Sequence, residues 1–184
     1  MAQGPTSDDA GGGRQLDFHP GMGMRWEITR STEETSGAAF EAKNWLDPQM
    51  PGPPTHVHPS WAESFEVIEG SLDVYQGGRW TTLGLGEKAT VPAGEPHTLR
   101  NGSDLPATIL TTIEPAQESE QLFRGLHRLI REGKIKRLPP KEPRSAIHAA
   151  MLFTAYPDEI RVTGPLGGVF KALAVVGKML RFKI

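Results

Sequence analysis

Three histidines and a glutamate occupy two short segments of the sequence, in an arrangement that could hold a metal ion. His56 and His58 are separated by one residue, Glu63 follows them, and His97 lies in a later segment. In an extended strand, residues i and i+2 point to the same face, so the first two imidazoles should lie side by side. Three nitrogens and one carboxylate oxygen would suit a divalent ion. The chain has no cysteine, so thiolate metal sites and a cysteine nucleophile are excluded.

The spacing between these residues explains how the chain could bring them together. Four residues separate the histidine pair from Glu63, which lets the chain turn and offer a carboxylate from the next strand. Glu66 has the opposite parity in that strand and should point away, so Glu63 is the predicted ligand. Turn-forming residues precede the strands that follow, namely Gly70, Gly86 and the run Pro92-Ala93-Gly94.

The elements that must position these residues are short strands. Between residues 20 and 115, glycine and proline separate apolar or alternating runs, which is typical of an antiparallel barrel or sandwich. Strands are predicted near residues 24–30, 38–46, 55–58, 63–69, 71–75, 80–83, 88–91, 97–100 and 107–112. The four candidate ligands all fall on these strands.

After about residue 115 the apolar residues recur at helical spacing. The clearest helix carries Leu122, Leu126 and Leu129 along one side and stops at Gly133. A second helix is predicted over residues 145–155 and a third over about 166–180.

The last predicted helix is amphipathic. One face gathers the apolar residues Leu166, Val169, Leu173, Val176 and Leu180. Lys171 and Lys178 fall on the opposite face and could touch anionic lipid. Asp158 and Glu159 dilute the local charge, so we expect the apolar face to be buried instead, on the barrel or in a dimer.

Two motifs combine the candidate ligands with the turn residues: His56-x-His58-x4-Glu63-x6-Gly70 and Gly86-x5-Pro92-x-Gly94-x2-His97-x3-Asn101. They resemble the two signature motifs of the cupin superfamily. One position departs from the family pattern, because Met50 stands where a glycine is usual, with Gly52 close by. The resemblance implies a mainly β fold, the double-stranded β-helix or cupin jelly-roll barrel, with a C-terminal α-helical extension outside it. It also implies one divalent metal ion held by His56, His58, Glu63 and His97.

These features predict three parts of the chain. Residues 1–15 contain a glycine triplet and no apolar run, so they are predicted to be a disordered tail rather than a secretory signal. Residues 16–115 are predicted to form the cupin β-barrel, and residues 116–184 the helical extension.

Several functions are compatible with such a site. Within the cupins, three histidines and one glutamate resemble the site of dioxygenases, but also that of isomerases and decarboxylases. Our first hypothesis is a metal-dependent enzyme, an oxidoreductase with a dioxygenase-like reaction, acting on a small, largely apolar molecule that carries oxygen. Glu63 can then also serve as a catalytic general base. The alternative is a non-catalytic cupin that binds a metabolite or a metal, so the sequence leaves open whether the protein is an enzyme. Nitrogen and oxygen ligands accept Fe, Mn, Ni, Zn, Co or Cu.

Composition limits the partners. The formal net charge of −2 predicts no nucleic-acid binding, and no apolar run is long enough for a membrane span. The lack of cysteine fits a reducing compartment, so we expect a cytoplasmic protein. The family resemblance implies a homodimer.

Other conspicuous side chains receive simpler interpretations. His19, His127 and His148 lack ligand partners at a useful spacing and are interpreted as solvated or helix-packing residues. Trp61 should either cap the mouth of the pocket or pack against a neighbouring subunit. Three residues should point inward by strand parity and line the pocket, namely Phe65, Val67 and Leu99.

Overall fold

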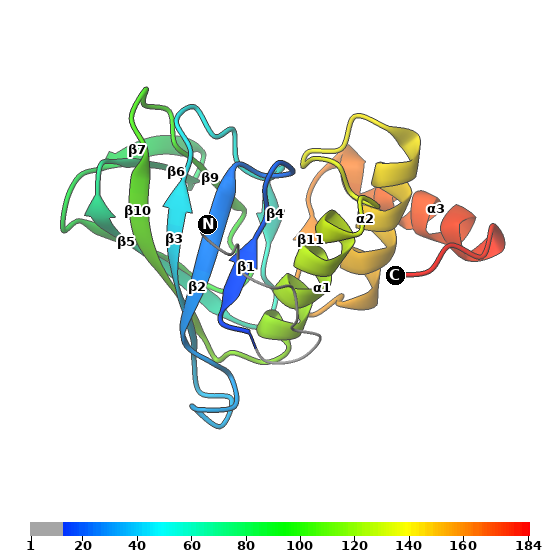
Figure 1. Ribbon diagram of the computed structural model, residues 1–184, viewed down its shortest axis with the longest axis horizontal. Helices are drawn as coiled ribbons and strands as arrows, with labels where there is room; N and C mark the ends of the chain where they lie inside the picture. Colours follow the sequence, from blue (N-terminus) through cyan, green and yellow to red (C-terminus); the bar gives the residue numbers. More distant parts are fainter. Residues whose placement is uncertain (1–12) are drawn as a thin grey trace, which may run out of the picture.

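The computed structural model describes residues 13–184, which form a barrel of two antiparallel sheets with three helices at one side (Figure 1). The first sheet contains β1 (Gln15–Asp17), β2 (Met24–Arg30), β3 (Phe40–Leu46), β5 (Ala62–Glu69), β8 (Lys88–Val91) and β10 (Ala107–Glu114). The second contains β4 (His56–Val57), β6 (Leu72–Gln76), β7 (Arg79–Leu83), β9 (His97–Arg100) and β11 (Arg161–Val162). The strand orders are β1-β2-β3-β10-β5-β8 and β11-β4-β9-β6-β7.

The mainly β fold, the double-stranded β-helix and all the predicted strands are confirmed, and two strands were missed. β1 has only three residues and β11 only two, so neither is long enough to show an alternating pattern. β11 lies within the region predicted to be helical, yet it pairs with β4 and extends the second sheet. The predicted tail over residues 1–15 falls almost entirely on residues 1–12, which lie outside the described part of the chain.

Alternation along the strands places the core between the two sheets. In β5, Glu63, Phe65 and Val67 are buried, whereas Ser64 and Glu66 are half-buried on the other face. This confirms the parity argument that selected Glu63 over Glu66. The inward face of β5 therefore presents one carboxylate among apolar side chains.

The three predicted helices are present as α1 (Ser119–Arg131), α2 (Pro143–Ala155) and α3 (Pro165–Met179). α1 buries its predicted apolar side, with Leu122, Leu126 and Leu129 in the core. α1 and α2 lie between the barrel and α3, which projects at the far end of the molecule (Figure 1). Within residues 13–184, no helix combines the length and hydropathy needed to cross a membrane.

The barrel does not bury the apolar face of the last helix, so the expected burial on the barrel is wrong, while burial in a dimer stays a prediction. α3 packs on α2 through a neighbouring stripe formed by Phe170, Ala174 and Gly177. A Cβ atom at Gly177 would lie 2.4 Å from the sulfur of Met151, so only glycine permits this close approach. Close packing along this stripe therefore decides which side of α3 is covered. Leu173 is partly buried, whereas Leu166, Val169, Val176 and Leu180 remain exposed.

Candidate metal centre

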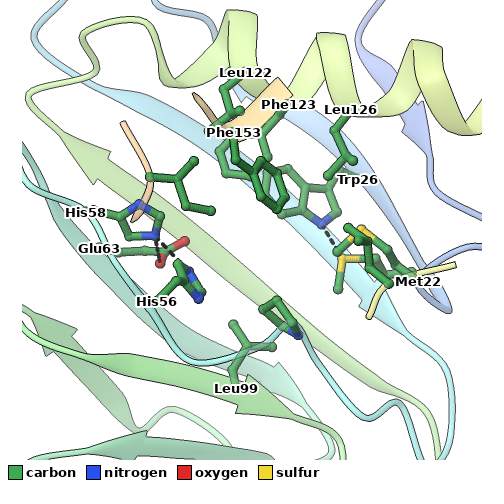
Figure 2. Close-up of a pocket in the computed structure, with 14 residues that line it drawn as sticks. Met22, Trp26, His56, His58, Glu63, Leu99, Leu122, Phe123, Leu126 and Phe153 are labelled. Carbon is green, nitrogen blue, oxygen red and sulfur yellow. Dashed lines mark hydrogen bonds and ion pairs between the residues drawn. The ribbon is translucent and has the colours of Figure 1, made fainter. Parts of the chain in front are cut away.

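The four predicted ligands come from strands of both sheets and meet at one point inside the barrel. His56 lies on β4 and pairs directly with His97 on β9, while Glu63 comes from β5 in the facing sheet. His58 follows β4 by one residue. All four side chains are buried, and one ligand atom from each lies within 4.8 Å of the others. The structure therefore brings together every residue of the predicted cluster, three of which are labelled in Figure 2.

The facing atoms of the cluster are at short distances. His97 Nε2 lies 3.0 Å from Glu63 Oε2, and His58 Nε2 lies 3.4 Å from the same oxygen. His56 Nε2 is 3.0 Å from His58 Nε2. Two ligand atoms on one divalent ion, each at about 2.0–2.2 Å, would be separated by similar distances.

Each histidine uses its other ring nitrogen to donate a hydrogen bond to a backbone carbonyl. The Nδ1 of His56 donates to Pro54 at 2.9 Å, and that of His97 donates to Glu95 at 3.0 Å. The Nδ1 of His58 donates to the carbonyl of Glu159 at 2.6 Å. A carbonyl only accepts, so the proton of each neutral ring sits on Nδ1 and the lone pair of Nε2 faces the cluster. Such bonds orient histidines that ligate metals.

The electrostatics of the cluster also suit a cation. Burial lowers the pKa of His56 well below its ordinary value, so this ring is neutral. Burial by itself raises the pKa of Glu63, but interactions of its carboxylate with the facing rings of His58 and His97 outweigh this effect, and the net pKa is lowered. Burial alone would lower the pKa of His97, yet the carboxylate of Glu63 raises it. A buried carboxylate thus faces imidazole nitrogens that carry lone pairs, and this donor set fits a divalent ion.

Trp61 and Glu159 support His58 in a way the sequence did not reveal. The indole ring stacks on the imidazole of His58, with centroids 3.5 Å apart and planes 15° apart. Its Nε1 donates to Glu159 Oε2 at 2.8 Å, while the Glu159 carbonyl accepts from His58. Trp61 is therefore enclosed at 1% exposure, and neither expectation for it is met. No local signal links Glu159 to a motif about a hundred residues earlier.

The segment before β4 shows how the departure from the family pattern is accommodated. Met50 is buried, and its sulfur lies 3.0 Å from the backbone nitrogen of Gly52. Gly52 has φ +76°, and a Cβ atom there would lie 1.7 Å from the carbonyl oxygen of Leu99. The glycine required for close passage over β9 is thus at position 52, and the ligands reach the same point.

A cavity of about 70 Å³ adjoins the cluster, and Figure 2 shows apolar side chains facing His56, His58 and Glu63 across it. The barrel contributes Met22, Met24, Trp26, Pro53 and Leu99. The region after the barrel contributes Leu122, Phe123, Leu126, Leu138, Phe153 and Ile160. Leu99 lines the cavity as predicted, whereas Phe65 and Val67 are buried elsewhere in the core. The only ionisable groups among the lining residues are His56, His58 and Glu63.

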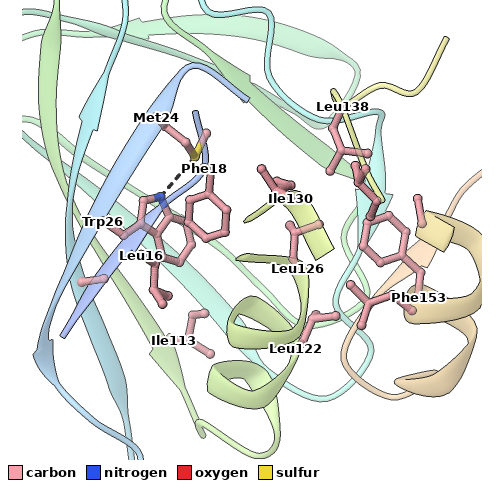
Figure 3. Close-up of a cluster of buried hydrophobic side chains, with 14 of the residues drawn as sticks. Leu16, Phe18, Met24, Trp26, Ile113, Leu122, Leu126, Ile130, Leu138 and Phe153 are labelled. Atoms are coloured by element: carbon pink, nitrogen blue, oxygen red, sulfur yellow. Dashed lines mark hydrogen bonds between the residues drawn. The ribbon is translucent and has the colours of Figure 1, made fainter. Parts of the chain in front are cut away.

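Aromatic packing holds α1 over this cavity. Phe123 of α1 lies 4.5 Å from Trp26 of β2, and Trp26 contacts Phe18 edge-on at 5.5 Å, measured between ring centroids. Leu122 and Leu126 of α1 and Phe153 of α2 belong to the same buried cluster (Figure 3). The predicted helical extension therefore closes one side of the barrel and forms much of the wall of the cavity.

The remaining histidines lie outside the cluster. His19 is partly exposed between Asp17 and Asp47, and His127 packs edge-on against Phe18. His148 is buried on α2 beside Phe182. These positions agree with the interpretation of these residues as solvated or helix-packing.

Residues 46–113 match the family model described as Cupin domain. This chain contains a cupin domain. The match runs from the end of β3 to the end of β10, so the cupin domain includes all four residues of the cluster, and the three helices lie outside it.

Solved structures resemble the cupin domain and the strands around it. KdgF from Halomonas sp. is 16% identical, with a TM-score of 0.50 over 58% of this chain and 89% of that chain. The protein TT1209 from Thermus thermophilus is 27% identical, with a TM-score of 0.47 over 54% and 89%. An uncharacterized conserved protein with a double-stranded β-helix domain from Klebsiella pneumoniae is 22% identical, with a TM-score of 0.44 over 50% and 76%. The first likeness supports the fold alone. No curated protein matches this chain.

Proposed function

We propose that this protein is a metal-dependent cupin in which His56, His58, Glu63 and His97 hold one divalent ion. The observation that carries the proposal is the 3.0 Å separation between the Nε2 atoms of His56 and His58. Both rings have already committed their Nδ1 hydrogens to carbonyls, so two lone pairs face each other in a buried site. Such a pair needs a positive charge between its members. Burial lowers the pKa of His56, which disfavours a shared proton and leaves a metal ion as the better partner.

The ligands leave several chemistries open. When bound, the ion would polarise a substrate oxygen, lower the pKa of bound water or, if redox-active, activate dioxygen. The donor set of nitrogen and oxygen accepts Fe, Mn, Ni, Zn, Co or Cu. We place a dioxygenase-like oxidation first, and isomerisation or decarboxylation after it.

The cavity supports a small, largely apolar substrate that carries oxygen. Leucine, methionine and aromatic side chains form most of the wall, and no lysine or arginine is among the lining residues of the described chain. An oxygen of the substrate would lie toward the histidine and glutamate cluster, and its apolar part toward α1 and α2. At roughly 10–15 Å³ for each water molecule, a cavity of about 70 Å³ holds only a few atoms. A larger substrate would require side chains of the helices to move.

Glu63 is the residue we assign to proton transfer. Its carboxylate lines the cavity and lies within 3.4 Å of two histidine nitrogens. The lowered pKa keeps it ionised at neutral pH, so it can accept a proton from a substrate bound beside it. Full turnover by a Glu63→Gln variant would remove this role.

The test compares metal-loaded protein with chelated protein. Substrate loss and oxygen uptake would be followed with small aromatic and carbonyl compounds, in air and without oxygen. We expect turnover only in the metal-loaded protein. A ligand that raises the melting temperature without being consumed would favour the alternative, a non-catalytic cupin that binds a metabolite or metal.

Assembly and location stay predictions. The family resemblance motivates the homodimer, which light scattering on the purified chain would check. The absence of cysteine motivates a cytoplasmic location.

A further inference from the structure

α3 carries most of the large apolar side chains that residues 13–184 expose. Ten such residues are exposed, and six of them lie on α3 or directly after it: Leu166, Val169, Val175, Val176, Met179 and Leu180. Met179 and Leu180 are exposed at 77% and 62%. A cluster of this kind on one helix differs from the scattered apolar residues of an ordinary surface and marks an interaction site.

The charged residues of this segment all have the same sign. Every charged residue between positions 165 and 184 is basic, namely Lys171, Lys178, Arg181 and Lys183. Within the described chain, none of them forms an ion pair. The two acidic residues closest before the helix do not offset them. Glu159 is buried and accepts from Trp61, and Asp158 pairs with Arg161 at 3.2 Å.

The packing of α3 leaves this face available. Phe170, Ala174 and Gly177 attach the helix to α2, with the tight contact at Gly177 described above. At 100° per residue, Val169 and Val176 lie on a separate side from these three residues. The helix also stands at the end of the molecule away from the barrel (Figure 1), so it can meet a flat surface without obstruction by the barrel.

We propose that α3 and residues 180–183 form a surface that binds an anionic lipid bilayer. The helix would lie in the plane of the interface, with its apolar side chains among the acyl chains and its basic side chains near the lipid phosphates. Long lysine side chains can reach the headgroups along the flank of such a helix. A second copy of the chain is a poorer partner for this segment, because it would bring further basic residues and no acidic residue from the same segment. This proposal is independent of the metal site.

The experiment uses the full chain and sedimentation with vesicles. Vesicles of phosphatidylcholine alone would be compared with vesicles that contain equal parts of phosphatidylcholine and phosphatidylglycerol. We expect the protein to sediment with the anionic vesicles, more weakly at high salt. The double variant Lys171→Ala, Lys178→Ala should bind roughly ten- to thirtyfold more weakly, because each basic residue near an anionic surface adds to binding.

A second set of variants separates apolar contact from charge. The triple variant Val169→Ser, Val176→Ser, Leu180→Ser should weaken binding at least about tenfold, because its apolar area no longer enters the bilayer. The double variant Leu85→Ser, Leu105→Ser is the matched control, since both residues are exposed, at 75% and 71%, and lie far from α3 in the chain. It should bind like the unmodified protein. Circular dichroism would confirm that all variants keep their helices.

Three results would overturn the proposal. The first is a protein that does not sediment with anionic vesicles. The second is equal binding by the α3 variants and the matched control. The third is an unmodified protein that light scattering finds to be a dimer while the triple variant is a monomer, because a second copy would then cover this face.

Discussion

His56 and His58 stand two residues apart in one motif, yet different regions of the molecule hold them. The ring of His56 donates to the carbonyl of Pro54, two residues earlier, and His97 donates to Glu95 in the same way. His58 instead donates to Glu159, which lies 101 residues later in the chain. Two of the proposed ligands are thus oriented by the barrel itself and one by the helical extension.

The difference shows that the extension belongs to the site. β11 pairs with β4, and Ser60 donates to the carbonyl of Asp158 at 2.6 Å, so the segment after α2 is attached to the strand that carries His56. The same segment places Glu159 between Trp61 and His58. A boundary drawn after residue 115 separates these contacts in the sequence, while the fold joins them.

The largest effect is expected from removing a ligand, whichever region supports it. His56→Ala and His58→Ala should each weaken divalent-ion binding by more than about a hundredfold. Losing a supporting group already weakens metal binding about tenfold to a hundredfold, and losing a ligand should weaken it further. Titration against a competing chelator measures this loss. If one variant binds as tightly as the unmodified protein, that histidine is no ligand and the comparison between the two fails.

The next largest effect is expected from weakening the packing between the barrel and the helical extension. Phe153→Ala in α2 should lower the free energy of unfolding by about 3 kcal/mol, because it leaves a cavity in the core. Leu99→Ala, which opens the same pocket from the barrel, is the matched control. Both variants should unfold in one cooperative transition when denaturant unfolding is followed by circular dichroism and tryptophan fluorescence. Two separate transitions, with the barrel unchanged by Phe153→Ala, would show that the extension folds independently.

Removing the hydrogen bond between Trp61 and Glu159, which together support His58, should have a moderate effect. Trp61→Phe keeps an aromatic ring over His58 but removes the hydrogen bond to Glu159, so divalent-ion affinity should fall about tenfold. Trp80→Phe, at an exposed tryptophan on β7, is the control and should leave affinity unchanged. Equal affinities for the two variants would show that the hydrogen bond between Trp61 and Glu159 does not support metal binding.

The sequence predicted the parts of this site that depend on local rules. Strand parity selected His56, His58 and Glu63, and turn residues indicated how the chain would bring in His97. Trp61 and Glu159 could not be paired in advance, because their contact depends on how α2 and β11 pack. The exposure of the apolar face of α3 was also not predicted. Helical periodicity shows which residues share a face, but it does not show that Gly177 would let a different face of the helix pack on α2.

A smaller effect is expected at His19, where both ring nitrogens face carboxylates rather than carbonyls. Nδ1 lies 2.7 Å from Asp17 and Nε2 lies 3.0 Å from Asp47. Partial burial lowers the pKa of His19, but these two carboxylates outweigh it and raise the pKa above its ordinary value. Such a ring holds its added proton to a higher pH, unlike the buried ring of His56, whose pKa is lowered.

The sign of the pH dependence follows from this raised pKa. The ion pairs of His19 stabilise the fold below the unfolded pKa of about 6.5 and lose this contribution as the pH rises through the folded pKa. His19→Gln should therefore destabilise the protein by less than about 1 kcal/mol at acidic pH, because the pairs are exposed. The difference should vanish at alkaline pH. Denaturant unfolding of both proteins at several pH values measures it, and a difference that grows with pH would contradict the assignment.

The most direct test of the metal centre is elemental analysis of the protein purified without chelator, beside a Glu63→Ala, His97→Ala double variant. We expect about one divalent ion per chain in the unmodified protein and none in the variant, with the fold of both checked by circular dichroism. An unmodified protein that is folded but takes up no divalent ion, even when Fe, Mn, Ni, Zn, Co and Cu are each supplied, would contradict the proposed metal centre.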